Sequence, residues 1–149
     1  MPYLFDTKIF LRLATSHDPA SPLALQAFQE LRTRRETLCY TPQVLAEFWS
    51  VGTRSPSARG GLGLSPADAD RRARVIERYF RLLPDSLATY REWRQLIVRY
   101  AVVGAQAHDA RLVASMKAYS ISHLVTFNVE HFRRYPDITV IEPQHLRPT

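Results

Sequence analysis

The stretch YLFDTKIF (Tyr3–Phe10) decides how this chain is interpreted, because an acid follows directly on an apolar run. The letters YLF predict a buried β-strand, and Asp6 stands where that strand would end. The apolar pattern continues to Leu13, so the strand either extends that far or gives way to a helix after Thr7. A carboxylate beside so many aromatic side chains must be compensated, because burying an unpaired charge costs free energy.

The composition predicts one globular domain over residues 1–149. Of these residues 46% are hydrophobic, which is enough to bury a substantial core. The only cysteine, Cys39, rules out an internal disulfide and a metal site built on thiolates, and it favours a reducing cytosol. No apolar run approaches the length of a membrane span, and the start of the chain lacks the pattern of a secretory signal. We therefore expect a cytoplasmic protein with no membrane segment.

The charge is strongly basic. The net charge is +6, and 18 of the 20 basic residues are arginine. Such a surface favours a polyanionic partner, because arginine binds phosphate through two parallel hydrogen bonds. Ordinary solvated charge is the alternative interpretation. A stripe of arginines at positions 71, 74, 78 and 81 is interpreted as a solvated helix face, with RNA contact as the alternative.

Strands alternate with helices along the rest of the chain. A capping residue followed by proline predicts helices that start at Ser21-Pro22, Thr41-Pro42 and Ser65-Pro66. The third of these is expected to bury Val75, Ile76, Tyr79, Phe80 and Leu83. Further helices are predicted after Ser86 and at His108–Tyr119, and further strands at Thr37–Tyr40, His123–Phe127 and Ile138–Ile141. This alternation predicts an α/β fold in which helices cover both faces of a parallel sheet.

Asp109 is the most informative of the other acids. In the segment HDARLVASM it shares a helix face with Leu112, Val113 and Met116, which form the buried stripe. A carboxylate that leads such a stripe points toward the core or into a cleft. The alternative is an acid that only caps the helix or interacts with its dipole.

Glu47 is the third acid of interest. On the helix PQVLAEFWS it lies beside Val44 and Val51, at the edge of an apolar face, although a partly exposed surface acid would look the same. Asp6, for its part, could serve only as a turn residue. In a parallel sheet, however, functional groups gather at the carboxyl ends of the strands, where all three acids could meet.

Clustered carboxylates repel one another, so a cation or a proton must neutralise them. Oxygen ligands without cysteine select Mg²⁺ or Mn²⁺. Such an ion binds phosphate oxygens and activates water for in-line displacement. Together with the basic chain, the acids lead to the hypothesis of a metal-dependent nuclease.

Over nearly its whole length the chain resembles a PIN domain, in particular the VapC-type toxin ribonucleases of bacterial toxin–antitoxin systems. The resemblance rests on five segments in this order: YLFDTKIFLRL (Tyr3–Leu13), TPQVLAEFWSVGTR (Thr41–Arg54), GLGLS (Gly61–Ser65), HDARLVASM (His108–Met116) and LVTFNVEHF (Leu124–Phe132). It implies a single PIN domain over residues 1–149, with a Rossmann-like, three-layer fold. The central sheet would have four or five parallel strands flanked by helices.

The resemblance also implies an activity and a site. It implies endonucleolytic cleavage of RNA with Mg²⁺ or Mn²⁺, in a protein that a VapB-like antitoxin encoded beside it neutralises. The metal ligands would be Asp6, Glu47 and Asp109, and Asn128 would occupy the family's fourth catalytic position. Homodimers are common in the family, so a homodimer is expected here.

Two residues depart from the family pattern. Lys8 stands where an asparagine usually follows the first aspartate and threonine, and His131 precedes Phe132 where an acid is usual. The ammonium of Lys8 could pair with the carboxylates and weaken metal binding, contact an RNA phosphate, or extend into solvent. His108, beside Asp109, is interpreted as a capping or supporting residue rather than a ligand.

Two other functions compete with the toxin nuclease. One is a catalytically weakened PIN domain that binds RNA or its antitoxin without efficient turnover. The other is a Mg²⁺-dependent phosphohydrolase on a different Rossmann-like scaffold. The second is disfavoured because the segment Asp6-Thr7-Lys8 lacks the second aspartate of an aspartyl-phosphate enzyme, and no glycine-rich phosphate loop follows it.

Overall fold

A very short strand opens the chain, and a helix follows it at once. In the computed structural model, which describes residues 1–148, β1 (Pro2–Phe5) ends just before Asp6 and α1 (Thr7–Leu13) begins just after it. Of the two sequence alternatives, the helix after the strand is the correct one. Asp6 has the extended backbone of a helix N-cap, and its Oδ1 accepts a hydrogen bond of 2.8 Å from the Thr7 backbone N–H. A short acidic side chain is favoured there because it satisfies an N–H with no partner inside the helix.

The sheet has five strands, all parallel, in the order β3-β2-β1-β4-β5. The strands after β1 are β2 (Thr37–Tyr40), β3 (Arg81–Leu82), β4 (His123–Val125) and β5 (Thr139–Ile141). At the centre, Leu4 of β1 lies between Cys39 of β2 and Leu124 of β4, and all three are fully buried. The predicted α/β fold with a parallel sheet of four or five strands is confirmed.

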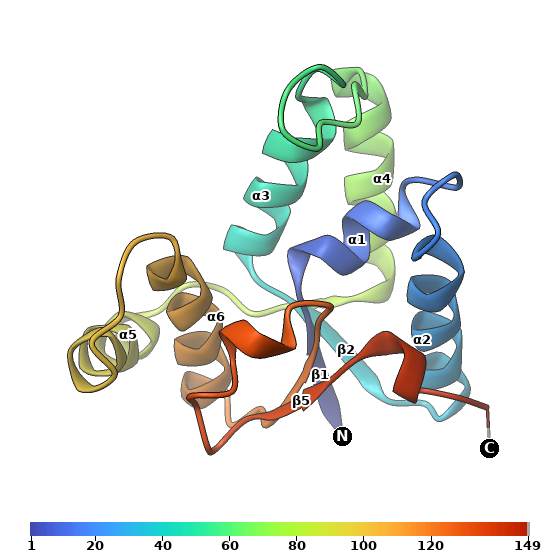
Figure 1. Ribbon diagram of the computed structural model, residues 1–149. Coiled ribbons are helices and arrows are strands. Elements are labelled where there is room, and N and C mark those ends of the chain that lie inside the picture. Colours follow the sequence, from blue (N-terminus) through green and yellow to red (C-terminus); the bar gives the residue numbers. More distant parts are fainter. Residues whose placement is uncertain (149) are drawn as a thin grey trace.

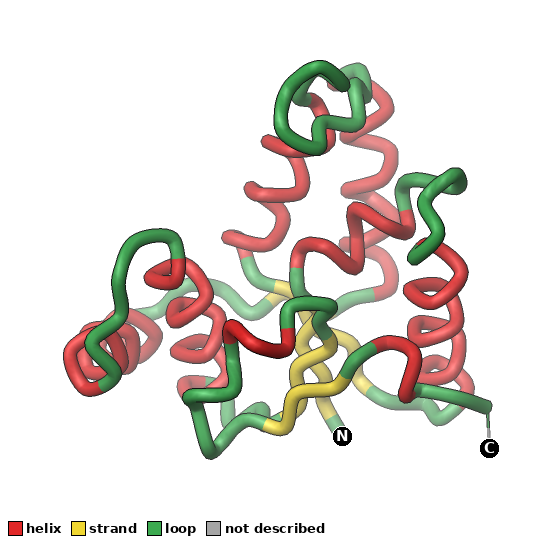
Figure 2. Tube along the Cα trace, viewed as in Figure 1, coloured by secondary structure: helices red, strands yellow, loops and turns green. Residues whose placement is uncertain are grey.

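Helices cover both faces of this sheet. After α1 they are α2 (Ser21–Thr33), α3 (Pro42–Thr53), α4 (Pro66–Tyr79), α5 (Leu87–Arg99) and α6 (Gln106–Ala118), with short 3₁₀ turns η1 (Val129–His131) and η2 (Pro143–His145). Figure 1 shows α5 and α6 on one side of the sheet and α2 on the other, with α1, α3 and α4 beyond the carboxyl ends of the strands. Figure 2 shows that the strands form a narrow layer between these helices.

The helix starts follow the capping signals with one exception. Thr41, Ser65 and Ser86 each accept a hydrogen bond from a backbone N–H in the first turn of α3, α4 and α5. At α2 the expected cap is wrong, because Ser21 is itself helical and Ala20 occupies the N-cap without a side-chain bond. The start of α6 also differs: it begins at Gln106, two residues before the predicted start.

The predicted buried face of α4 is partly wrong. Ile76, Phe80 and Leu83 are buried, but Val75 is 55% exposed and Tyr79 lies at the surface. The helix ends at Tyr79, so the helical spacing no longer applies to the residues that follow. Strand β3 comes next and was not predicted, because two residues with exposed side chains carry no periodic signal.

Candidate functional site

Asp6 is a buried carboxylate at the carboxyl end of the central strand. It is 5% exposed, and its Oδ2 accepts a hydrogen bond of 2.7 Å from the Thr126 hydroxyl, which follows β4. Burial raises the pKa of Asp6, the hydrogen bonds from Thr126 and Thr7 oppose this rise, and the negative charges of Asp109 and Glu47 add to it. The charges of Asp109 and Glu47 therefore act on the Asp6 carboxyl.

Glu47 reaches the same place from the middle of α3. Its Oε2 accepts a hydrogen bond of 2.8 Å from the Thr7 hydroxyl, and its Oε1 accepts one of 2.9 Å from the Gln43 side-chain N–H. The same Gln43 nitrogen donates to the His108 carbonyl at 2.9 Å. Because both partners are acceptors, the amide nitrogen must face them, and this leaves Gln43 Oε1 buried without a hydrogen-bond partner within residues 1–148.

Asp109 lies in the first turn of α6, half-buried at the edge of the same space. Its Oδ2 is 3.1 Å from Nδ1 of His131, a residue of η1. Burial raises the pKa of Asp109, the neighbouring His131 lowers it, and Glu47 raises it. The departure from the family pattern at position 131 therefore places an imidazole directly against one of the candidate ligands.

Asn128 and Lys8 lie together at the rim of the site. The Lys8 ammonium donates to Asn128 Oδ1 at 3.2 Å, and the Asn128 backbone N–H donates to the Thr126 hydroxyl at 3.0 Å. Lys8 is exposed, and within the part of the chain that the structure describes no carboxylate lies within ion-pair distance of its ammonium. Its charge therefore lies at the entrance to the site and is not neutralised by a direct partner.

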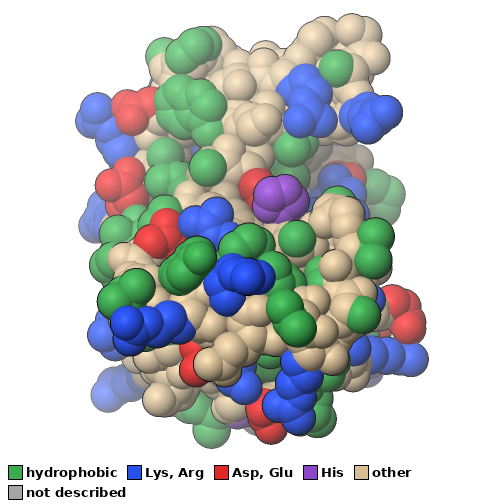
Figure 3. All heavy atoms as spheres, turned by 90° about the vertical axis from the view of Figure 1, so that its left-hand side faces the viewer, with side chains coloured by type: hydrophobic (Ala, Val, Ile, Leu, Met, Phe, Trp, Pro, Cys, Tyr) green, Lys and Arg blue, Asp and Glu red, His purple; other side chains and the backbone are tan. Residues whose placement is uncertain are grey.

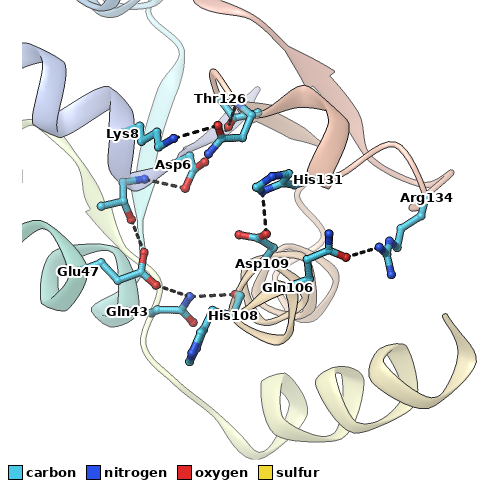
Figure 4. Close-up of polar contacts among 12 residues, drawn as sticks. Asp6, Lys8, Gln43, Glu47, Gln106, His108, Asp109, Thr126, His131 and Arg134 are labelled. Carbon is cyan, nitrogen blue, oxygen red and sulfur yellow. Dashed lines mark hydrogen bonds and ion pairs between the residues drawn. The ribbon is translucent and has the colours of Figure 1, made fainter. Parts of the chain in front are cut away.

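Figure 4 shows that the carboxylates of Asp6, Glu47 and Asp109 face one open space, which α1, α3 and α6 surround. Each carboxylate is held by its neighbours, and no group of three or more His, Cys, Asp or Glu within residues 1–148 could hold a metal ion as the side chains stand. The donor set still fits a hard divalent cation, because it consists of carboxylate oxygen atoms.

Sequence reasoning did not identify the neutral partners of the acids. Thr7, Gln43 and Thr126 orient the carboxylates, and only their proximity in the folded chain reveals it. For Thr7 a signal existed, because it directly follows Asp6 and opens a helix. For Gln43 and Thr126 the sequence carries no such signal, since glutamine and threonine are common in helices and at strand ends.

Within the described residues, no helix is both long enough and apolar enough to cross a membrane.

The fold is similar to those of several solved bacterial structures. VapBC2 of Rickettsia felis, solved bound to a promoter DNA fragment, gives a TM-score of 0.67 at 18% identity, with 95% of this chain and 98% of that chain covered. VapC20 of Mycobacterium tuberculosis, described as a sarcin-ricin loop cleaving toxin, gives 0.65 at 16% identity, with 89% and 95% covered. FitAcB of Neisseria gonorrhoeae gives 0.67 at 17% identity, with 96% and 99% covered.

No curated protein sequence matches the chain significantly. The PIN domain family model, in contrast, matches it over residues 3–138, which is most of its length. This match agrees with the resemblance, the parallel sheet and the placement of Asp6 at the carboxyl end of the central strand. The chain therefore belongs to the PIN domain family.

Proposed function

We propose that this chain is a toxin endoribonuclease of the VapC type, in which Asp6, Glu47 and Asp109 hold a divalent metal ion. The observation that carries the proposal is the group of three carboxylates around one space, two of them with raised pKa values. Gathered negative charge of this kind is unfavourable without a cation. Membership of the PIN domain family and the basic charge of the chain add support.

The residues have distinct tasks in this proposal. Mg²⁺ or Mn²⁺, when bound, would act as a Lewis acid toward a phosphate oxygen and lower the pKa of a water molecule. Asp6, Glu47 and Asp109 would all supply ligand charge, and Glu47 would also accept a proton from water at the site. Asn128 orients the phosphate at the rim through its side-chain amide, beside the ammonium of Lys8.

The test is metal-dependent cleavage of a mixed-sequence RNA. Wild type should cleave it with Mg²⁺ or Mn²⁺ and not with EDTA, and Asp6→Asn and Asp109→Asn should lose the activity. Asp137→Asn changes an exposed acid outside the site and serves as the matched control. Undiminished cleavage by Asp6→Asn would refute the assignment of the site.

The alternative is a PIN domain that binds RNA or an antitoxin with little turnover. The observation that favours it is the Lys8 ammonium at the entrance, a positive charge where the family usually has a neutral amide. In this case wild type would bind RNA without cleaving it, and Lys8→Asn would restore cleavage.

We also propose a VapB-like antitoxin as a partner, because a similar structure from Klebsiella pneumoniae is a toxin–antitoxin complex. An apolar groove of about 240 Å³ between α1, α2 and α4 offers a surface for it. The groove includes Leu25, Val75 and Tyr79, three large side chains that the core leaves exposed. Val75→Asp should abolish co-purification with the antitoxin encoded beside the toxin, and Val103→Asp, at an exposed position outside the groove, should not.

We further propose that the protein is a homodimer in the cytoplasm. Light scattering of the purified chain measures the mass of the particle and tests the dimer.

A further inference from the structure

A second pocket lies next to the carboxylates, between α5 and α6. Its volume is about 390 Å³, which falls within the range of roughly 300–1,000 Å³ typical of ligand sites. Side chains of Tyr90, Trp93 and His108 line it, together with an ion pair at its rim. Neither the metal site nor the antitoxin groove includes these residues.

The aromatic side chains of this pocket are not explained by the core. Tyr90 is 56% exposed, and its ring lies 6.4 Å from that of Trp93 at an angle of 46°. An exposed aromatic pair in a concave site offers faces on which a planar ring can stack. Most of the surface that lines the pocket is apolar, although Ser86 and Thr89 also contribute to it, and this suits a base better than it suits a phosphate.

The pocket is physically joined to the carboxylate site. Trp93 Nε1 donates to the Ala107 carbonyl at 2.9 Å, in the first turn of α6 and two residues before Asp109. The His108 carbonyl accepts from Gln43, which also bonds Glu47. In Figure 4 the His108 ring points away from the carboxylates. His108, between Ala107 and Asp109, therefore separates the two sites and forms a wall of the pocket.

The polar groups of the pocket also suit a nucleotide. Arg111 and Asp85 form an ion pair of 3.2 Å at the rim, so donors and an acceptor lie side by side there. Helix α5 carries three arginines against one acid: Arg91, Arg94, Arg99 and Glu92. Figure 3, which views the side on which α5 and α6 lie, shows basic and hydrophobic side chains interleaved over this face. This combination is typical of surfaces that bind single-stranded nucleic acid, where bases stack and cations follow the backbone.

We propose that the pocket between α5 and α6 holds the base of an RNA nucleotide adjacent to the phosphate that is cleaved, stacked on Tyr90 and in contact with the edge of Trp93. This inference rests on the proposed ribonuclease function and adds a base subsite to it. A base held there fixes the position of the neighbouring phosphate relative to Asp109 and Glu47. The pocket thereby contributes to the choice of the cleavage position.

Trp93 itself can report the binding. The chain has two tryptophans, and the other, Trp49, lies on α3 outside the pocket. In the double variant Asp6→Asn/Trp49→Phe, Trp93 is the only source of tryptophan emission and the RNA stays intact. This protein is titrated, without metal, with a mixed-sequence 12-mer RNA and with an abasic ribose-phosphate chain of equal length and charge. A saturable change in emission is expected with the base-bearing RNA only.

Tyr90→Ala in this background tests the stacking directly. Its affinity for the base-bearing RNA should fall by roughly 5- to 100-fold, the range found for the loss of one stacked base, while its affinity for the abasic chain should not change. Val98→Ala is the matched control, since Val98 lies on the same helix, is 71% exposed and does not line the pocket. Circular dichroism checks that each variant is folded.

The outcomes separate the two proposals. If RNA and the abasic chain bind equally, and Tyr90→Ala has no effect, the chain binds RNA but the base pocket is wrong. If neither chain binds, the ribonuclease proposal and the pocket fail together. If the emission depends on protein concentration and not on RNA, a second copy of the chain covers the pocket, and the inference is overturned.

Discussion

Thr7 links two of the three carboxylates: its hydroxyl donates to Glu47 Oε2 at 2.8 Å, and its backbone N–H donates to Asp6 at 2.8 Å. The first residue of α1 thus ties the end of the central strand to the middle of α3. The Thr7 hydroxyl and the Gln43 amide together hold the Glu47 carboxylate in its orientation. The rest of the site depends on similar contacts from neutral side chains.

The hydroxyl of Thr7 should therefore matter for activity. Thr7→Val keeps the shape and removes the donor, and we expect cleavage at fixed Mg²⁺ to fall by about 10- to 100-fold, the usual cost of losing a partner that orients a metal ligand. Thr7→Ser keeps the hydroxyl and should stay within a few-fold of wild type. The measurement is the initial rate of RNA cleavage against Mg²⁺ concentration. A fully active Thr7→Val would contradict the role assigned to this contact.

Lys8 should reduce the affinity of the site for metal. Its ammonium bonds Asn128 and has no direct acidic partner among residues 1–148, so its charge opposes that of an incoming cation. Lys8→Asn should tighten Mg²⁺ binding by about three- to tenfold, once the Coulomb energy is discounted for solvent exposure. Titration calorimetry of wild type and variant measures this change.

The other lysine supplies the matched control. Lys117 pairs with Asp137 on the surface, and Lys117→Asn should leave the Mg²⁺ affinity unchanged. If Lys8→Asn and Lys117→Asn behave alike, then the charge of Lys8 has no influence on the site.

Asp6 should make the metal-free protein less stable as the pH rises. Its pKa is raised above the ordinary value of 3.8, chiefly by burial, so the folded chain holds the proton to a higher pH than the unfolded chain does. The contribution of this proton to the free energy of unfolding is complete at pH values below the pKa that Asp6 has in the unfolded chain. It is lost as the pH rises through the pKa that Asp6 has in the folded chain. Asp6→Asn should therefore melt at a higher temperature than wild type at pH 7.5, and the difference should shrink toward pH 4.

Thermal denaturation in EDTA at several pH values measures this effect, and Asp137→Asn is the exposed control. Adding Mg²⁺ should stabilise wild type and not Asp6→Asn, because only the wild-type site keeps its full ligand charge. A variant Asp6→Asn that is less stable than wild type at pH 7.5 would show that the hydrogen bonds to Thr7 and Thr126 outweigh the cost of burial.

RNA binding should weaken with added salt. For single-stranded RNA each neutralised phosphate contributes about 0.7 to the slope of log K against log salt, so three contacts lower the affinity about tenfold or more between 50 and 200 mM.

Of the arginine stripe on α4, Arg71 and Arg74 pair with acids of their own helix, which supports the interpretation of this stripe as a solvated helix face. Fluorescence anisotropy in EDTA measures the slope, and a flat dependence would rule out an electrostatic contribution from the arginines.

The sequence was sufficient to predict the parallel sheet and the place of Asp6. An apolar run that ends in an acid predicted a strand end at Asp6, although the sequence left open whether strand or helix follows, and the helical spacing around Asp109 predicted that its side chain points inward. These predictions depend on the spacing of apolar residues within one strand or helix, and the folded chain keeps those residues on the buried face. The end of α4 escaped prediction because the spacing of apolar residues continues through Phe80 and Leu83 after the helix has stopped.

The contacts that orient the acids could not be predicted, because they join distant segments. Thr126 is 120 residues from Asp6, and His131 is 22 residues from Asp109. No periodic pattern encodes such a pair. It depends on the order of the strands, which brings β4 beside β1, and on the loop that follows each strand.

The position of Cys39 has a practical consequence. Its thiol is fully buried on β2, opposite Leu4, and burial raises its pKa, so the reactive thiolate is scarce in the native protein. A thiol reagent can label the chain only when the central strands separate. The labelling rate at limiting reagent therefore measures the equilibrium opening of the strand pair that leads to Asp6, and at saturating reagent it measures the opening rate itself. Labelling of this single cysteine therefore reports how long the sheet that carries the site stays closed.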